Sequence, residues 1–213
     1  MKWWNHFWRN SVRAASEPIG RVQLNLPGWN EDTPAEDMRI WRDIDGDVLS
    51  LAISSEPFPY FDRAEVMDIR KWARELAQGN GGGLIEACRL NEGVKIIYKR
   101  LQMPAYVYSG MLLNRVREVW LAWTVVAGER GVTGLREAIV TSNLISEGKL
   151  KPEEYEQRWG QDPYDPAFRS VVDRSLLRFM SDDESYDQQF PRHPLSKVRQ
   201  TLATIAKNVD YSS

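Results

Sequence analysis

The sequence is poor in the residues that build disulfide-bonded or zinc-bound scaffolds. Among its 213 residues are one cysteine, Cys88, and two histidines, His6 and His193. A single thiol cannot form an internal disulfide bond, and it cannot supply the ligand set of a zinc finger. Because no oxidative cross-link is needed, the composition favours a reducing compartment, and we expect a cytoplasmic protein.

Long apolar runs and a large net charge are also missing. The longest apolar candidate, residues 119–127, has the length of a strand, whereas a membrane span needs about 20 apolar residues. Asn5, His6 and Arg9 interrupt the apolar residues near the N-terminus, so we expect no secretory signal there. The formal net charge of −2 disfavours a protein that binds nucleic acid through its phosphates.

Tryptophan, by contrast, is abundant, with nine residues in the chain. On a helical wheel of about 100° per residue, residues 2–16 separate into an apolar half rich in aromatic rings and a basic half. We predict that this arm, residues 1–17, contacts a partner and is separated by Glu17-Pro18 from one α+β domain over residues 18–213. The expected partner-binding residues are Trp3, Trp4, Phe7, Trp8, Arg9 and Arg13.

Two other interpretations of the arm stay open. It could cover an apolar strip of its own domain, which is the usual role of exposed aromatic residues near a terminus. It could also lie in a membrane interface, where aromatic rings and cations are favoured, although one short helix gives only marginal membrane binding.

The pattern of the first half predicts strands around one helix. Residues 21–29 alternate like a half-buried strand that stops at Pro27-Gly28. Residues 38–53 are typical of a hairpin around the turn pair Asp45-Gly46. A helix is then expected from Asp62, as its N-cap, to Gly79.

The second half continues with strands and ends with helices. Short separators between the next four runs predict an antiparallel meander over residues 84–90, 94–101, 105–113 and 116–127. Helices are expected over residues 134–146, from Asp165-Pro166 to about Met180, and from His193-Pro194 onward. The sequence therefore predicts an α+β fold, with helices packed on a twisted antiparallel sheet.

The order of these elements, with the turn Leu26-Pro27-Gly28-Trp29, resembles the PsbP-like fold over about residues 20–130. The resemblance implies a PsbP-like core, followed by a helical C-terminal extension that the family pattern does not cover. Small bacterial relatives of this fold include chaperone-type adaptors for secreted effectors. The resemblance therefore implies a protein-binding role, although a shared fold alone does not fix a function.

Three stretches contain residue types that could perform chemistry. The carboxylates of residues 43–47 surround Gly46, but the glycine is fourth in the run and Ser54 is twelfth, which does not fit an EF-hand calcium loop. We expect a solvated hairpin turn there. The glycines of residues 127–140 could expose an anion site beside Arg130 and Arg136, but such glycines more often allow a strand-to-helix bend.

The third stretch, residues 181–194, combines acidic side chains with an imidazole. A divalent metal would accept such ligands, and the candidates are Asp183, Asp187 and His193. Asp182 and Glu184 add further carboxylates to the run. Acidic runs between helices are, however, usually solvated.

These observations favour a non-enzymatic protein that binds another polypeptide, as an adaptor, an effector chaperone or an immunity-type protein. The sequence has no Gly-x-Ser-x-Gly nucleophile elbow, and Cys88 lies in an apolar strand where a thiol is normally inert. We expect no cofactor, and a secreted effector or toxin is one class of partner; a homo-oligomer is compatible with the sequence. The alternatives are a metal-assisted hydrolase that uses residues 182–193, and a peripheral membrane protein attached through the arm.

Overall fold

The computed structural model describes most of the chain, and the observations below concern the described residues. These are residues 19, 22–32, 38–54, 65–90, 93–116, 119–155, 160–168, 173–208 and 210–211. The arm predicted to bind a partner, residues 1–17, lies outside them.

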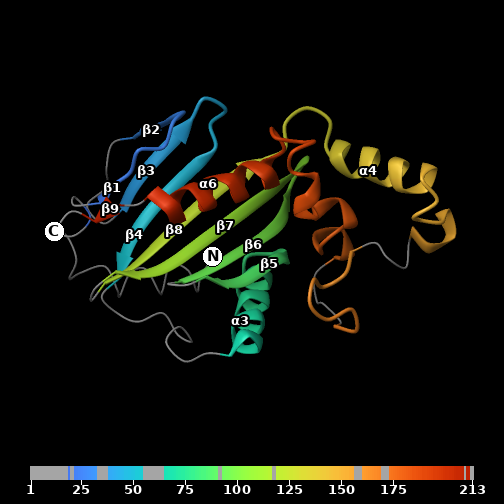
Figure 1. Cartoon of the computed structure of the whole chain (residues 1–213), viewed down its shortest axis with the longest axis horizontal. Coiled ribbons are helices and arrows are strands. Elements are labelled where there is room, and N and C mark those ends of the chain that lie inside the picture. The colour runs from blue at the N-terminus through green and yellow to red at the C-terminus, as the bar shows by residue number, and fades with distance from the viewer. Residues whose placement is uncertain are drawn as a thin grey trace.

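A seven-stranded antiparallel sheet forms the centre of the fold, with the strand order β2-β3-β4-β8-β7-β6-β5 (Figure 1). Its strands are β2 (Trp29–Glu31), β3 (Met38–Asp43), β4 (Val48–Ser54), β5 (Gly82–Leu90), β6 (Gly93–Gln102), β7 (Ala105–Val116) and β8 (Val119–Gly128). Two short strands, β1 (Val22–Gln23) and β9 (Asp210–Tyr211), pair separately from this sheet. The predicted α+β class is confirmed.

The hairpin and the meander predicted from the sequence are both present. Strands β3 and β4 pair around a turn in which Gly46 has a φ of 78°, a conformation that favours glycine. Strands β5 to β8 form the meander, and β8 then pairs with β4, so that the hairpin extends the sheet. This last pairing is a long-range contact that periodicity does not encode.

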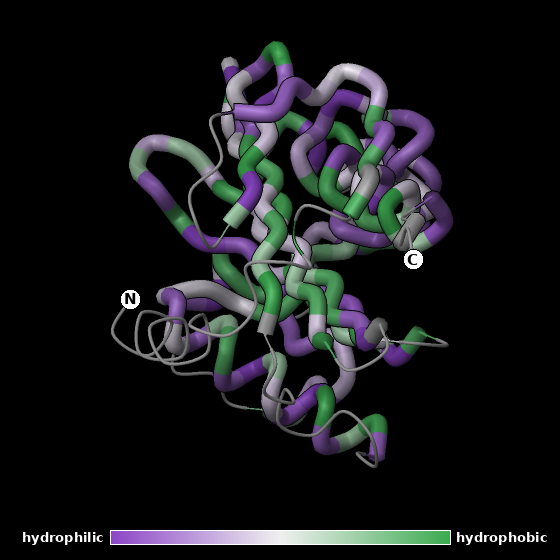
Figure 2. Tube along the Cα trace, turned by 90° about the vertical axis from the view of Figure 1, so that its left-hand side faces the viewer, coloured by the Kyte–Doolittle hydropathy of each residue, from purple (hydrophilic) through white to green (hydrophobic). Residues whose placement is uncertain are grey.

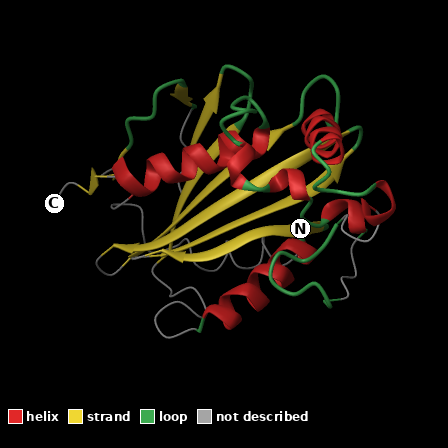
Figure 3. Cartoon of the chain, turned by 45° about the vertical axis from the view of Figure 1, so that its right-hand side comes forward, coloured by secondary structure: helices red, strands yellow, loops and turns green. Residues whose placement is uncertain are grey.

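Both faces of the sheet are covered, which explains why β8 is an almost unbroken apolar run. Helix α3 (Val66–Gly79) packs on one face and α6 (Pro194–Asn208) on the other, as Figure 3 shows. Successive residues of β8 alternate between these layers: Trp120 lies in the cluster with α3, whereas Trp123 lies in the cluster with α6. Figure 2 shows hydrophobic residues, in green, along the central strands.

Helix α6 confirms the apolar stripe expected after His193-Pro194. Leu195, Val198, Leu202 and Ile205 recur at helical spacing and are at most 1% exposed. Helix α4 (Leu135–Ser146) confirms the helix expected over residues 134–146, and it follows Gly134, whose φ is 77°. The described residues contain no helix that is long and apolar enough to cross a membrane.

Two expectations in the first half need correction. The strand within residues 21–29 stops before Pro27-Gly28 as expected, but it covers only Val22–Gln23 (β1), and Trp29 begins β2, which belongs to the other sheet. Gly28 has a φ of 84°, which interrupts an extended backbone. Helix α3 has Glu65 as its N-cap, without a side-chain hydrogen bond, and the predicted cap Asp62 lies outside the described residues.

The helix expected from Asp165 to Met180 is wrong in its described parts. Asp165 accepts hydrogen bonds from the backbone N–H groups of Ala167 and Phe168, which form a turn. Farther on, Leu177 and Phe179 have an extended backbone, with ψ values of 170° and 165°, so no helix continues through them. Two short 3₁₀ turns, η3 (Arg174–Leu176) and η4 (Met180–Asp182), occur there instead. Two others, η2 (Pro152–Glu154) and η5 (Glu184–Tyr186), lie before and after this stretch.

The close approach of η3 to β5 generates a stability prediction. A Cβ on Gly83 would contact the backbone carbonyl of Leu176, with the carbonyl carbon 2.6 Å away. We expect Gly83→Ala to lower the free energy of unfolding by about 1–3 kcal/mol, because backbone atoms must move apart. Gly79→Ala is the matched control, since nothing lies within 4 Å of a Cβ there. Equal urea midpoints for the two variants would contradict this packing.

Candidate functional site

A groove of about 490 Å³ lies where three segments meet beyond the ends of strands β3, β4 and β8. The segments are the turn between β3 and β4, residues 128–136 between β8 and the first turn of α4, and residues 189–194 before α6. The volume is within the range of about 300–1,000 Å³ that is typical of ligand sites. Because the segments are far apart in sequence, only the tertiary structure creates this groove.

The lip of the groove is apolar and exposed. Val132 is 71% exposed and Leu135 is 51% exposed, and both line the groove. Phe190, on the 189–194 segment, is half-buried and lines it as well. When a binding partner covers apolar side chains that are this exposed, the removal of apolar surface from water stabilises the complex.

Glu129 and His193 lie next to each other in the lining of the groove. The Oε1 atom of Glu129 accepts a hydrogen bond from the Gly134 backbone N–H at 3.3 Å, and it lies 3.3 Å from His193 Nε2. The Nδ1 atom of His193 accepts a hydrogen bond from the Leu195 N–H. In this arrangement Nδ1 is the acceptor of the ring, and Nε2 is the atom that can donate to Glu129.

The second oxygen of Glu129 has no comparable contact. The Glu129 side chain is 6% exposed, and its Oε2 atom is buried without a hydrogen-bond partner among the described residues. Glu129 lines both the groove and a cavity of about 10 Å³ beside it. A buried carboxylate oxygen without a donor is costly, so this atom is the one in the lining that calls for a ligand.

The predicted hairpin turn places three carboxylates beside the groove. Asp43, Asp45 and Asp47 have oxygen atoms within 4.8 Å of one another, close enough to share a cation. The Lys197 ammonium of α6 hydrogen-bonds all three, at 2.6 Å for Asp43 and 2.8 Å for Asp45. Although burial lowers the pKa of Lys197, these hydrogen bonds raise it overall, which keeps the ammonium charged.

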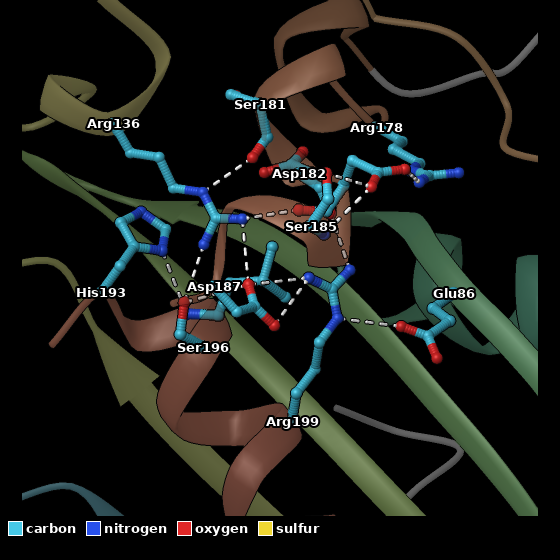
Figure 4. Close-up of polar contacts among 12 residues, drawn as sticks. Glu86, Arg136, Arg178, Ser181, Asp182, Ser185, Asp187, His193, Ser196 and Arg199 are labelled. Atoms are coloured by element: carbon cyan, nitrogen blue, oxygen red, sulfur yellow. Dashed lines mark hydrogen bonds and ion pairs between the residues drawn. The ribbon is translucent and has the colours of Figure 1, made fainter. Parts of the chain in front are cut away.

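A buried network of arginines fixes the segments around the groove (Figure 4). Arg136, on the first turn of α4, donates to the backbone oxygens of Ser181 and Asp183 at 2.7 and 2.9 Å. It also donates to Ser196 Oγ on α6 at 2.8 Å and to an Asp187 carboxylate oxygen at 3.0 Å. The guanidinium is 2% exposed and well supplied with acceptors.

Arg199 of α6 extends the network toward β5. Its Nη1 atom donates to Asp187 at 3.1 Å, its Nη2 atom to the Asp182 carbonyl at 2.7 Å, and its Nε atom to Glu86 at 3.0 Å. Although burial raises the pKa of Glu86, the hydrogen bond from Lys95 and the charge of Arg199 lower it overall. The carboxylate is therefore ionised in the folded protein.

A fully buried lysine supports η4 from below. Lys99 of β6 is 0% exposed, its Nζ atom lies 3.1 Å from Asp182 Oδ2, and the Phe179 ring centroid is 3.2 Å away. Burial lowers the pKa of Lys99, and the nearby Asp182 carboxylate opposes that shift. Asp182 also accepts a hydrogen bond from the Phe179 N–H, so the pair holds the turn on the sheet.

The structure brings the sequence candidates of residues 181–194 into this network. Asp183 pairs with Arg178 at 2.9 Å, Asp187 pairs with Arg136 and Arg199, and His193 faces Glu129. The anion candidates Arg130 and Arg136 line the groove, but Arg130 is bound to Asp47 at 2.7 Å. Cys88 is half-buried in β5, and burial raises the pKa of its thiol.

Sequence reasoning missed the roles of Glu129, Lys99 and Lys197. Glu129 is visible in the sequence only as part of the glycine-rich stretch, which predicts a strand-to-helix bend. Lys99 lies in the apolar run of β6, and a charged residue at such a position is a usable signal of a buried partner. Nothing in the local sequence connects Lys197 with a hairpin about 150 residues earlier.

Removing the Lys99 charge tests the buried pair. We expect Lys99→Met to lower the free energy of unfolding by about 3–5 kcal/mol, because it leaves Asp182 buried without a counter-charge. The double variant Lys99→Met with Asp182→Asn should regain most of that loss, since no uncompensated charge remains. Urea unfolding measures both. A double variant less stable than the single one would contradict this account.

The lowered pKa of Glu86 predicts a loss of stability in acid. Its ionised form contributes stability above its ordinary pKa of 4.5, and this contribution is lost as the pH falls through the lower folded value. Glu86→Gln should therefore lose less stability below pH 4.5 than the unmodified protein, in thermal unfolding at a series of pH values. Glu75→Gln, at an exposed position of α3, should follow the unmodified profile.

Comparisons with known proteins show the fold. A solved structure of a mutant of the protein Mog1 is similar at 10% identity and a TM-score of 0.40, covering 61% of this chain and 81% of that chain. A crystal structure at 1.50 Å of a protein from Bacteroides thetaiotaomicron is similar at 12% identity and a TM-score of 0.34. The match covers 55% of this chain and 42% of that chain. No protein-family model and no curated protein matches. Both likenesses concern the fold alone.

Proposed function

We propose that this protein binds another polypeptide, as an adaptor, an effector chaperone or an immunity-type protein, and that its groove is the docking site. The observation that carries the proposal is the exposed apolar lip of Val132 and Leu135 on a framework of buried ion pairs. Interfaces of this kind place apolar anchors at the centre and polar groups at the rim.

The apolar surface continues beyond the groove along α4. Leu135 and Ile139 are four residues apart and therefore share one face of the helix, and Ile139 is 36% exposed. The buried residues of α4, Arg136 and Val140, lie about 100° around the helix from this exposed face. A surface that extends from a groove onto a helix face suits a polypeptide better than a compact small molecule.

The docking surface is held in place before any partner arrives. Arg136 anchors the first turn of α4 to the 181–187 segment and to α6. A prearranged surface loses less conformational entropy on binding, so more of the contact energy appears as affinity.

The state of the acidic residues supports binding over the metal-assisted hydrolase alternative. Asp183 and Asp187 are neutralised by arginines, so a divalent metal would first have to break these ion pairs. Asp43, Asp45 and Asp47, which are close enough to share a cation, already share the Lys197 ammonium. The tryptophan-rich arm remains a second candidate contact surface.

A pair of variants matched in exposure tests the docking site. Val132→Asp should weaken the partner's binding about tenfold or more, because it puts a charge into the apolar lip. Met67→Asp, on α3, is the control, since Met67 is 68% exposed and Val132 71%. The partner is first recovered with the unmodified protein as bait, then purified and titrated calorimetrically against each variant. Equal dissociation constants for the two variants would remove the groove from the proposal.

A further inference from the structure

We propose that the groove recognises a basic side chain of the partner, a lysine or an arginine, and that the Glu129 carboxylate accepts its hydrogen bond. This inference rests on the proposed function and adds the chemistry of the anchor residue. The inference is based on the Glu129 side chain, which is more than nine-tenths buried and lines the groove. Its Oε2 atom has no hydrogen-bond donor among the described residues.

The hydrogen-bonding state of Glu129 indicates a donor ligand. Oε1 is satisfied by the Gly134 N–H and by His193, whereas Oε2 has no partner among the described residues. An ionised carboxylate is an acceptor only, so the group that completes it must be an N–H or O–H donor. A charged donor gives the stronger bond, because charge-assisted hydrogen bonds are about twice as strong as neutral ones.

Two of the cations in the lining are already paired, Arg130 with Asp47 and Arg136 with Asp187, so neither donates to Oε2. In the adjoining hairpin turn, the three aspartates bind Lys197 and Arg130 and lie near the charge of Arg192. Arg192 is exposed on the same lining and would suit an acidic neighbour of the basic anchor.

The lip fits the shape of such a side chain. Lysine and arginine have long aliphatic stems that pack on apolar surface while the charged end reaches a polar group. Val132, Leu135 and Phe190 supply the apolar surface, and Glu129 belongs to the same lining. A donor that reaches Oε2 would replace the cost of an unsatisfied buried acceptor with a charged hydrogen bond.

The test uses small probes on the full chain, followed by NMR titration. Nα-acetyl-lysine methylamide should shift the amide signals of Glu129 and Gly134 at millimolar concentration. Nα-acetyl-norleucine methylamide, which lacks the ammonium, should bind about tenfold more weakly. If the two probes bind equally in the unmodified protein, the proposal is overturned without any variant.

Two isosteric variants locate the effect. Glu129→Gln keeps an acceptor for Gly134 but loses the charge, so the preference for the lysine probe should disappear. Glu137→Gln is the control, because Glu137 lies on the first turn of α4, accepts a hydrogen bond from Tyr155 at 2.7 Å and lines the small cavity but not the groove. It should keep the preference, and thermal unfolding checks that both variants are folded.

The competing occupant of Oε2 is a single water in the neighbouring cavity, whose volume of about 10 Å³ is about that of one water probe. If Glu129→Gln binds the lysine probe as the unmodified protein does, Oε2 is assigned to that water and the inference fails. The proposed function would still stand if Val132→Asp weakens partner binding in the same preparation. If Val132→Asp leaves partner binding unchanged, the groove is not the docking site. The preference for the lysine probe then still decides whether Glu129 binds a basic group.

Discussion

The buried guanidinium of Arg136 is the interaction on which the groove depends. It joins the first turn of α4 to the 181–187 segment and to the start of α6, elements far apart in the chain. Its bond to the buried carbonyl oxygen of Ser181 supplies a donor to an acceptor that is out of reach of water. Arg130 with Asp47, and Glu129 with His193, add further bonds between the segments that line the groove.

The buried ion pairs of the interior cost stability, but they hold the segments around the groove in one arrangement. Lys99 with Asp182, and Arg199 with Glu86, are taken out of water, and such pairs are often no more stable than apolar replacements. Their directional bonds nevertheless hold η4 and η5, short turns with little hydrogen bonding of their own, in one arrangement. The lip of the groove thereby stays exposed and in place.

The sequence predicted most of the regular elements, because their signals are local. The Asp45-Gly46 turn, the meander and the stripe of α6 follow from turn chemistry and periodicity, and the structure confirms them. The 165–180 segment misled the same reasoning. Its aspartate-proline start is typical of a helix, but burial of Leu176 and Phe179 against the rest of the fold overrides that preference.

The candidate site shows most clearly which features follow from the sequence and which depend on the tertiary structure. The sequence by itself determined an α+β fold and marked the glycine-rich and acidic stretches that contain Glu129, Arg136 and His193. Only the tertiary structure decided that these stretches meet, that Lys197 binds the hairpin aspartates, and that one oxygen of Glu129 has no donor among the described residues. The physical reason is that turn and helix signals act between near neighbours, whereas hydrogen bonds and charge pairing are settled by whichever groups the packed sheet brings together.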